Sequence, residues 1–155
     1  MKYVGIDLGT TNSAICSFDG DKIHLYKSPE QHDVTPSAIF IDRRGNKYVG
    51  SRAYNSAAKN PDNAAVLFKR LMGTSTPVKL SAVNLTMTPE ECSAEVLRSL
   101  FGYLPEEIRG DGDTGTVITV RGQQQGDPFK EPEFFNALMG IWLGPKPADW
   151  KLKDG

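Results

Sequence analysis

The sequence predicts an α/β protein in which a mixed sheet is combined with helices. Short apolar runs separated by turn residues near the N-terminus indicate antiparallel strands. Farther along, apolar residues recur at helical spacing. A run of β-branched residues, TVITV at 116–120, is typical of a buried strand. The chain has 155 residues, a length that suggests one domain or one lobe of a larger one.

The N-terminal region predicts three strands of an antiparallel meander, Tyr3–Leu8, Ser13–Phe18 and Lys22–Tyr26. The first two are joined by a tight polar turn, Gly9 to Asn12. The next two are joined at Asp19-Gly20-Asp21, where Asp-Gly is a strong hairpin signal. A second hairpin is expected from Ser37–Ile41 and Lys47–Val49, with its turn at Asp42–Gly45.

Two helices are expected in the middle of the chain. Asn60 followed by Pro61 predicts a helix start, and Gly73 predicts its end. Its apolar face would consist of Ala64, Leu67, Phe68 and Leu71. The second helix starts at Thr88-Pro89-Glu90-Glu91, where Thr and Glu have capping-box spacing. Its apolar face would consist of Cys92, Val96, Leu97, Leu100, Phe101 and Leu104.

The C-terminal part has a different character. Gly110–Gly115 predicts a flexible acidic turn, and Arg121–Asp127 predicts a polar loop. Glu133–Leu143 predicts an amphipathic helix, which Gly144-Pro145-Lys146-Pro147 ends. The apolar face of this helix would consist of Phe134, Phe135, Leu138, Met139 and Trp142.

Composition argues against several classes of protein. The formal net charge is −1, whereas a surface for nucleic acid or an anionic membrane needs a basic patch. No apolar run approaches the roughly 20 residues that span a bilayer. The apolar run near the N-terminus is too short and too polar for a secretory signal. Cys16 and Cys92 are too few for a disulfide framework or a metal cluster, so the reducing cytoplasm is the expected location.

The segment GIDLGTTNS, Gly5 to Ser13, has residue types suited to phosphate. Gly9 allows the backbone to approach a ligand closely. Thr10, Thr11 and Asn12 offer backbone N–H groups and short polar side chains to phosphate oxygens. Asp7 ends the first strand, where its carboxylate could hold a hydrated Mg²⁺ ion. An ordinary polar hairpin with a capping aspartate would explain the same residues.

GIDLGTTNS resembles the first phosphate loop of the actin-like ATPase superfamily, and specifically that of the 70-kDa heat-shock (DnaK-type) chaperones. The resemblance continues in the same order and with compatible spacing as far as Val120. VTPSAIF is similar to the entry into the family's outer subdomain, and Val49–Gly73 resembles its paired helices with a Lys-Arg pair. TPEECSAEVLRSL is similar to its next helix, and TVITV to the strand that returns to the inner subdomain.

The resemblance implies a role for individual residues. Gly9, Thr10, Thr11 and Asn12 would contact the phosphates of ATP or ADP, and Asp7 would act through Mg²⁺-bound water. Lys69 would orient the attacking water and stabilise the γ-phosphate, which is how phosphoryl transfer uses a positive charge. Arg70 would lie beside the nucleotide cleft. Without the resemblance, Lys69 and Arg70 are explained as the solvated basic end of a helix.

The resemblance also implies the organisation of the chain. Residues 1–120 would form the incomplete first lobe of an actin-like, ribonuclease-H-like ATPase fold, with 38–112 as the outer subdomain. Residues 121–155 would be a divergent tail. The sequence contains no second phosphate loop of the DLGGGT kind. We therefore expect nucleotide binding with impaired ATP hydrolysis, because positioning needs both walls of a cleft.

The tail resembles a second family. Gly122–Asp149 is similar to the C-terminal strand and helix of bacterial chalcone-isomerase-like domains. Two alternatives to the nucleotide-binding function follow, a non-catalytic remnant or interaction module, and a protein whose tail binds a small apolar ligand. The chaperone family implies co-chaperones and unfolded clients as partners, and no nucleic acid or membrane. Self-association is also expected, because half a domain leaves apolar surface without its partner.

Overall fold

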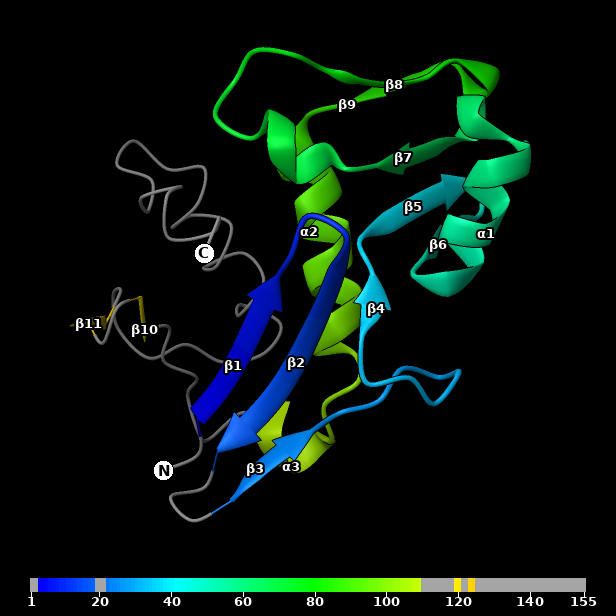
Figure 1. The fold of residues 1–155 in the computed structure, drawn as a ribbon. Helices are drawn as coiled ribbons and strands as arrows, with labels where there is room; N and C mark the ends of the chain where they lie inside the picture. The colour runs from blue at the N-terminus through cyan, green and yellow to red at the C-terminus, as the bar shows by residue number, and fades with distance from the viewer. Residues whose placement is uncertain (1–2, 19–21, 110–118, 121–122, 125–155) are drawn as a thin grey trace. The chain divides into compact units, whose positions relative to one another are not determined.

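The computed structural model describes residues 3–18, 22–109, 119–120 and 123–124 (Figure 1). The chain divides into two compact units. Among the described residues, those as far as Tyr103 belong to the first unit and those from Leu104 onward to the second. Each unit is a separate body, so their elements are described in turn.

The first unit begins with the predicted antiparallel meander, which we call sheet A. Strands β1 (Tyr3–Leu8), β2 (Asn12–Phe18) and β3 (Ile23–Leu25) pair in chain order, and a short strand β4 (Thr35–Pro36) also pairs with β2. The meander prediction is thus confirmed, whereas the predicted turn at 19–21 lies outside the described residues. The alternating burial of β2 gives sheet A one covered face, against which α2 packs.

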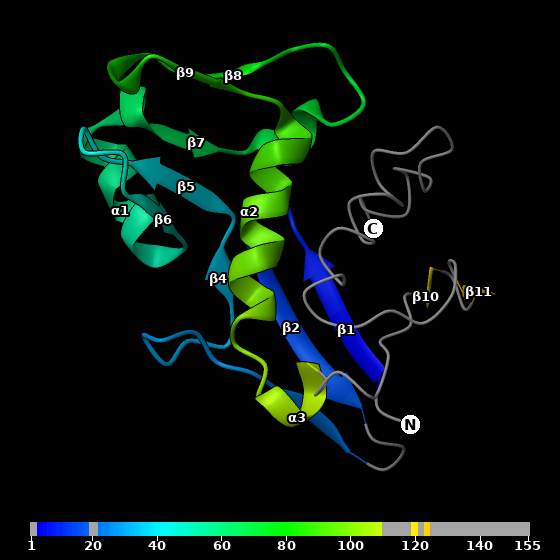
Figure 2. The same cartoon turned by 180° about the vertical axis from the view of Figure 1, so that it is seen from behind.

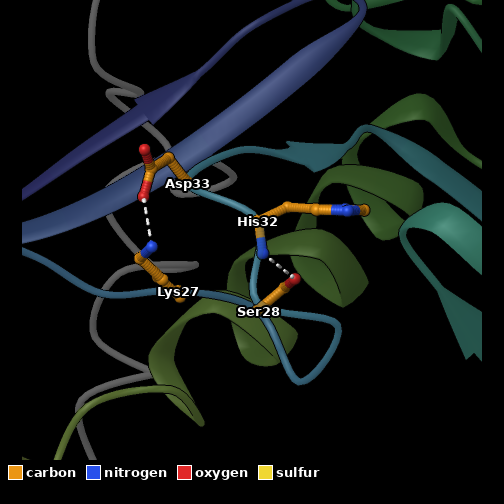
Figure 3. A network of polar contacts seen from close by, with 4 residues as sticks. All are labelled: Lys27, Ser28, His32 and Asp33. Carbon is orange, nitrogen blue, oxygen red and sulfur yellow. Dashed lines mark hydrogen bonds and ion pairs between the residues drawn. The ribbon is translucent and has the colours of Figure 1, made fainter.

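Polar contacts close the connection between β3 and β4 (Figure 3). The N–H of Ser28 donates to the carbonyl of His32 at 2.9 Å, and the N–H of His32 donates to Ser28 Oγ at 3.2 Å. Lys27 and Asp33 form an exposed ion pair at 3.8 Å. These contacts fold the segment back on itself, so that the chain returns to pair with β2.

The second predicted hairpin is also confirmed. Strand β5 (Ala38–Ile41) pairs with β6 (Lys47–Val49) and, on its other side, with β7 (Ala64–Val66), forming sheet B. The Asp42 carboxylate organises the turn by accepting the N–H groups of Arg44 and Asn46. The hydrogen bond from the Asn46 side chain is the largest cause that lowers the pKa of Asp42.

The predicted helix over residues 60–73 is wrong. Its residues form a 3-10 turn (Pro61–Asn63), strand β7 and a second 3-10 segment, η2 (Phe68–Leu71). Asn60 makes no side-chain cap, and Leu67 has a φ of 57°, which interrupts any helix. Strand β7 pairs with the neighbouring β5 instead, so tertiary pairing overrides the helical spacing of the apolar residues there.

One helix precedes this stretch, where the resemblance implied a pair. Helix α1 (Ser51–Lys59) follows Gly50, whose φ of 99° suits glycine, and packs against β5. Only Ala53 of its residues is buried, so its apolar signal is weak. Farther on, β8 (Val78–Leu80) and β9 (Leu85–Met87) form a two-stranded sheet around a 3-10 turn, Ser81–Val83.

Helix α2 (Pro89–Phe101) matches its prediction closely. Thr88 Oγ1 accepts the N–H of Glu91 at 3.0 Å, which is the predicted cap. The helix runs along sheet A and also contacts sheet B (Figure 2). Four of the six predicted apolar positions are buried within it, Cys92, Val96, Leu97 and Leu100. Phe101 is half-buried, and Leu104 is buried but lies beyond the end of the helix.

The described part of the second unit is small. It contains helix α3 (Glu106–Arg109) and an antiparallel pair of strands, β10 (Thr119–Val120) and β11 (Gln123–Gln124). The loop predicted at 121–127 is therefore wrong at Gln123–Gln124, because these residues pair with the preceding strand. The predicted turn at 110–115 and helix at 133–143 lie outside the described residues. Within the described ranges, no helix is long and apolar enough to cross a membrane.

Cys92 on α2 is expected to be chemically inert in the folded protein. Its side chain is 0% exposed, and burial, assisted by Glu91 and Glu95, raises the pKa of its thiol from 9.0 to about 12. In a Cys16→Ser background, iodoacetamide at pH 8 should therefore modify Cys92 only when the protein unfolds. Mass spectrometry with and without urea checks this, and rapid native modification would contradict it.

The raised pKa of the Cys92 thiol makes the stability of the fold depend on pH. A raised folded-state pKa contributes stability that is complete below pH 9 and is lost as the pH rises from 9 toward 12. Compared with Cys92→Ala, the parent should lose more of its free energy of unfolding over that interval.

Candidate functional site

The Gly9–Asn12 turn connects β1 to β2 and forms the candidate phosphate site. The strand register brings Leu8 opposite Ser13, so the chain reverses within these four residues. A Cβ on Gly9 would overlap the carbonyl oxygen of Asn12. Glycine is therefore required here by the close approach of the Asn12 backbone, whereas the sequence predicted a close approach to a ligand.

Ser37 attaches this turn to the rest of the first unit. Its Oγ donates to the carbonyl of Gly9 at 2.8 Å, and its N–H donates to the carbonyl of Thr11 at 2.8 Å. Ser13 Oγ lies 2.8 Å from Ser37 Oγ. The two serines are 1% and 3% exposed, so the bond between their hydroxyls forms away from water. Within the described part of the chain, the N–H groups of Thr10 and Thr11 have no acceptor.

Asp7 lies on β1 opposite Ala14, and its side chain is exposed. Its neighbours Ile6 and Leu8 point to the other face of sheet A, since side chains alternate along a strand. No group of three or more His, Cys, Asp or Glu residues among the described positions could enclose a metal. Asp7 is thus a single accessible carboxylate, separated from the Gly9–Asn12 turn by one residue, Leu8.

Lys69 and Arg70 lie together on η2, but their environments differ. Lys69 is 7% exposed, whereas Arg70 is exposed. In the described part of the chain, the Lys69 ammonium has neither a hydrogen-bond acceptor nor an ion-pair partner. Buried lysines are rare unless they are paired, so this arrangement is costly and calls for a partner that the described residues do not supply. The solvated-helix-end explanation is wrong for Lys69, which is buried, and η2 is a short 3-10 segment.

The structure brings the predicted site residues into two groups. Asp7 and the Gly9–Asn12 turn share one hairpin, and Lys69 and Arg70 share η2. Both β2 and η2 pack against α2, and the β1–β2 turn lies toward the N-terminal end of α2 in Figure 1. Met72, which follows η2, accepts a hydrogen bond from Ser93 of α2 through its Sδ at 3.0 Å. No hydrogen bond or ion pair between described residues joins the two groups.

Ser13 and Ser37 were not among the residues that the sequence singled out. They are 24 positions apart, and nothing in either local pattern indicates that their hydroxyls meet. The one available signal is a polar residue at an inward-facing strand position. Ser13 on β2 shares the covered face of sheet A with Ile15 and Ser17. That signal marks burial, not the partner.

Two family models match the chain. Residues 3–79 match a family described as Hsp70 protein, and residues 108–155 match one described as chalcone isomerase-like. Both resemblances expected from the sequence are thereby confirmed, although the second match begins before Gly122.

Among curated proteins, the chain is similar to chaperone protein DnaK of Mycoplasmoides gallisepticum (strain R(low / passage 15 / clone 2)). The two are 40% identical over 119 residues, which cover 76% of this chain and 20% of that protein. The chain thus spans about a fifth of that relative's length. The mixed α/β architecture is compatible with part of an Hsp70 nucleotide-binding domain, which has the actin-like ATPase fold. The N-terminal part of the chain, from residue 3 to residue 79, therefore matches the Hsp70 protein family.

Proposed function

We propose that the N-terminal unit binds the phosphates of ATP or ADP, together with Mg²⁺, as part of a chaperone nucleotide-binding domain. The observation that carries this proposal is the Gly9–Asn12 turn. Its first residue has no room for a Cβ, and the N–H groups of Thr10 and Thr11 have no acceptor in the described chain. Free backbone N–H groups in a tight turn form an anion-binding concavity.

The residues present fit a magnesium nucleotide. Mg²⁺ usually keeps several waters and takes one or two carboxylates plus phosphate oxygens, and it supplies charge neutralisation when bound. A single exposed carboxylate, Asp7, suits contact through metal-bound water. Thr10, Thr11 and Asn12 add short polar side chains to the backbone donors.

Lys69 and Arg70 complete the proposed site with positive charge. Lys69 is buried, its ammonium group lacks an acceptor in the described chain, and it would gain one in the γ-phosphate. A fixed positive charge at that position stabilises the charge of the transferring phosphoryl group and orients the attacking water. Arg70, which is exposed, would lie beside the nucleotide at the edge of the cleft. We expect this chain by itself to bind nucleotide but to hydrolyse ATP poorly.

The remaining family properties are part of the same proposal. The resemblance to the chaperone family implies coupling of ATP hydrolysis to protein folding and binding of unfolded clients and co-chaperones. A cytoplasmic location is proposed with them. Self-association is favoured by the open face of sheet A. Phe18, Ile23 and Leu25 are exposed there, and the β2–β3 register puts them on one face.

Thermal unfolding of the full chain tests the nucleotide proposal. MgATP, MgADP and magnesium tripolyphosphate should raise the unfolding midpoint, because a ligand that binds only the folded state stabilises it. At 100 times the dissociation constant the gain is about 2.7 kcal/mol. Adenosine, which lacks phosphates, should have little effect. Absence of any shift with ATP, with and without Mg²⁺, would contradict the proposal.

A second candidate function rests on the chalcone isomerase-like match over residues 108–155. It predicts binding of a small apolar, flavonoid-like ligand by the C-terminal part. In the same unfolding experiment, a shift with a flavonoid and none with ATP would favour this candidate.

A further inference from the structure

Ser37 occupies the point where the segment β4–β5 passes the Gly9–Asn12 turn. It directly follows β4 and directly precedes β5, the central strand of sheet B. Its two donors, N–H and Oγ–H, bind two alternate carbonyls of the turn, those of Thr11 and Gly9. Such a double attachment fixes the orientation of two peptide groups as well as their position.

The direction of the hydroxyl bonds follows from the number of protons. Ser37 Oγ carries one proton, and a carbonyl oxygen can only accept, so that proton lies toward Gly9. The bond between the two serine hydroxyls must then run from Ser13 Oγ–H to Ser37 Oγ. The result is a relay, Ser13 to Ser37 to the Gly9 carbonyl, in which each bond strengthens the next in a buried setting.

The relay has a consequence for the opposite side of the turn. A trans peptide is planar, so its C=O and N–H point in opposite directions. Because Ser37 holds the Gly9 carbonyl, the N–H of Thr10 in the same peptide group must point away from Ser37. The Thr11 carbonyl and the N–H of Asn12 are related in the same way. Ser37 therefore holds two carbonyl oxygens of the turn on its own side. The N–H groups of the same two peptide groups point to the opposite side.

We propose that Ser37 is a positioning residue for phosphate binding, and that Ser13 supports it through the relay. Without the hydroxyl of Ser37, the Gly9–Thr10 peptide group can rotate, and a carbonyl oxygen that faces phosphate repels it. This inference rests on the nucleotide-binding function proposed above. It adds that the turn is pre-organised from the segment that enters sheet B, so movement of that segment alters phosphate affinity.

The test compares single variants of the full chain by titration with MgADP. Ser37→Ala removes the hydroxyl and should weaken binding about tenfold, the usual effect of one lost hydrogen bond near a charged ligand. Ser37→Thr retains the hydroxyl and should remain within about twofold of the parent. Ser17→Ala is the matched control, because Ser17 is equally buried on β2 but bonds Tyr26 OH at 2.7 Å, away from the turn.

Each outcome separates a positioning role from a structural one. Ser37→Ala and Ser17→Ala should lose comparable thermal stability, whereas only Ser37→Ala should lose affinity. Equal MgADP affinity of Ser37→Ala and the parent would overturn the inference. If Ser37→Ala does not fold, Ser13→Ala decides, with a partial loss of affinity in support and parental affinity against. Failure of the parent itself to bind MgADP would instead overturn the underlying nucleotide proposal.

Discussion

Replacement of Gly9 by alanine is expected to abolish measurable binding of MgATP and to destabilise the fold. The added Cβ would meet the carbonyl oxygen of Asn12, which is backbone and has no rotamer to escape into. The turn must therefore open, breaking at least one of the two bonds that Ser37 makes to it. We expect a loss of about 1 to 3 kcal/mol in the free energy of unfolding.

Gly45→Ala provides the matched control for this change. Gly45 also lies in a hairpin turn, but a Cβ there has no atom within 4 Å, although its φ of 87° is unfavourable for alanine. The control should cost about 1 to 2 kcal/mol in conformational strain and leave MgATP affinity unchanged. Urea denaturation gives the first quantity and titration with MgATP the second. A Gly9→Ala protein that binds MgATP like the parent would show that the tight turn is not needed for phosphate.

The predicted hairpins and α2 show what local pattern can determine. Strand alternation and polar turn residues locate β1, β2 and the β5–β6 hairpin, because each of these elements buries one face and turns within a few residues. Thr88 locates the start of α2 through a bond to Glu91 only three positions away. In each case the interaction that defines the element lies within the window from which it was predicted.

The secondary-structure predictions are wrong where residues far apart in the sequence determine the local structure. Ala64 and Ala65 are good helix formers, yet they pair with β5, a strand about 25 positions earlier in the chain. The helical spacing of Phe68 and Leu71 was therefore misleading. Helix α1 was not predicted from local pattern, although the resemblance implied helices there, because only one of its residues, Ala53, is buried.

The features of the candidate site are likewise of two kinds, those set by neighbours in the sequence and those set by distant residues. The need for glycine at position 9 is set by Asn12, a neighbour within the turn, whereas contact of Gly9 with phosphate stays a prediction. The hydrogen bonds from Ser37 to the turn could not be predicted, because they depend on how β4 pairs with β2. Burial of Lys69 was likewise beyond local pattern. A Lys-Arg pair resembles a solvated end of a helix until the chain around it is folded.

Lys69→Met is expected to move stability and affinity in opposite directions. Methionine is also long and unbranched, and it fills the same space without an ammonium group that lacks a partner in the described chain. Removing that buried charge should stabilise the free protein by about 0.5 to 2 kcal/mol. Affinity for MgATP should fall by about tenfold or more, because a charge-assisted bond to the γ-phosphate is lost. Affinity for MgADP should change much less.

Lys59→Met separates this effect from a general loss of positive charge. Lys59 ends α1 and is exposed, so its replacement should change stability by less than about 0.5 kcal/mol and leave both affinities unchanged. Lower stability of Lys69→Met would mean that the ammonium has a stabilising partner. Equal MgATP affinity would exclude the γ-phosphate as that partner. The expected opposite signs have one physical origin, because a charge buried at a cost in the free protein is available to a ligand that brings the missing negative charge.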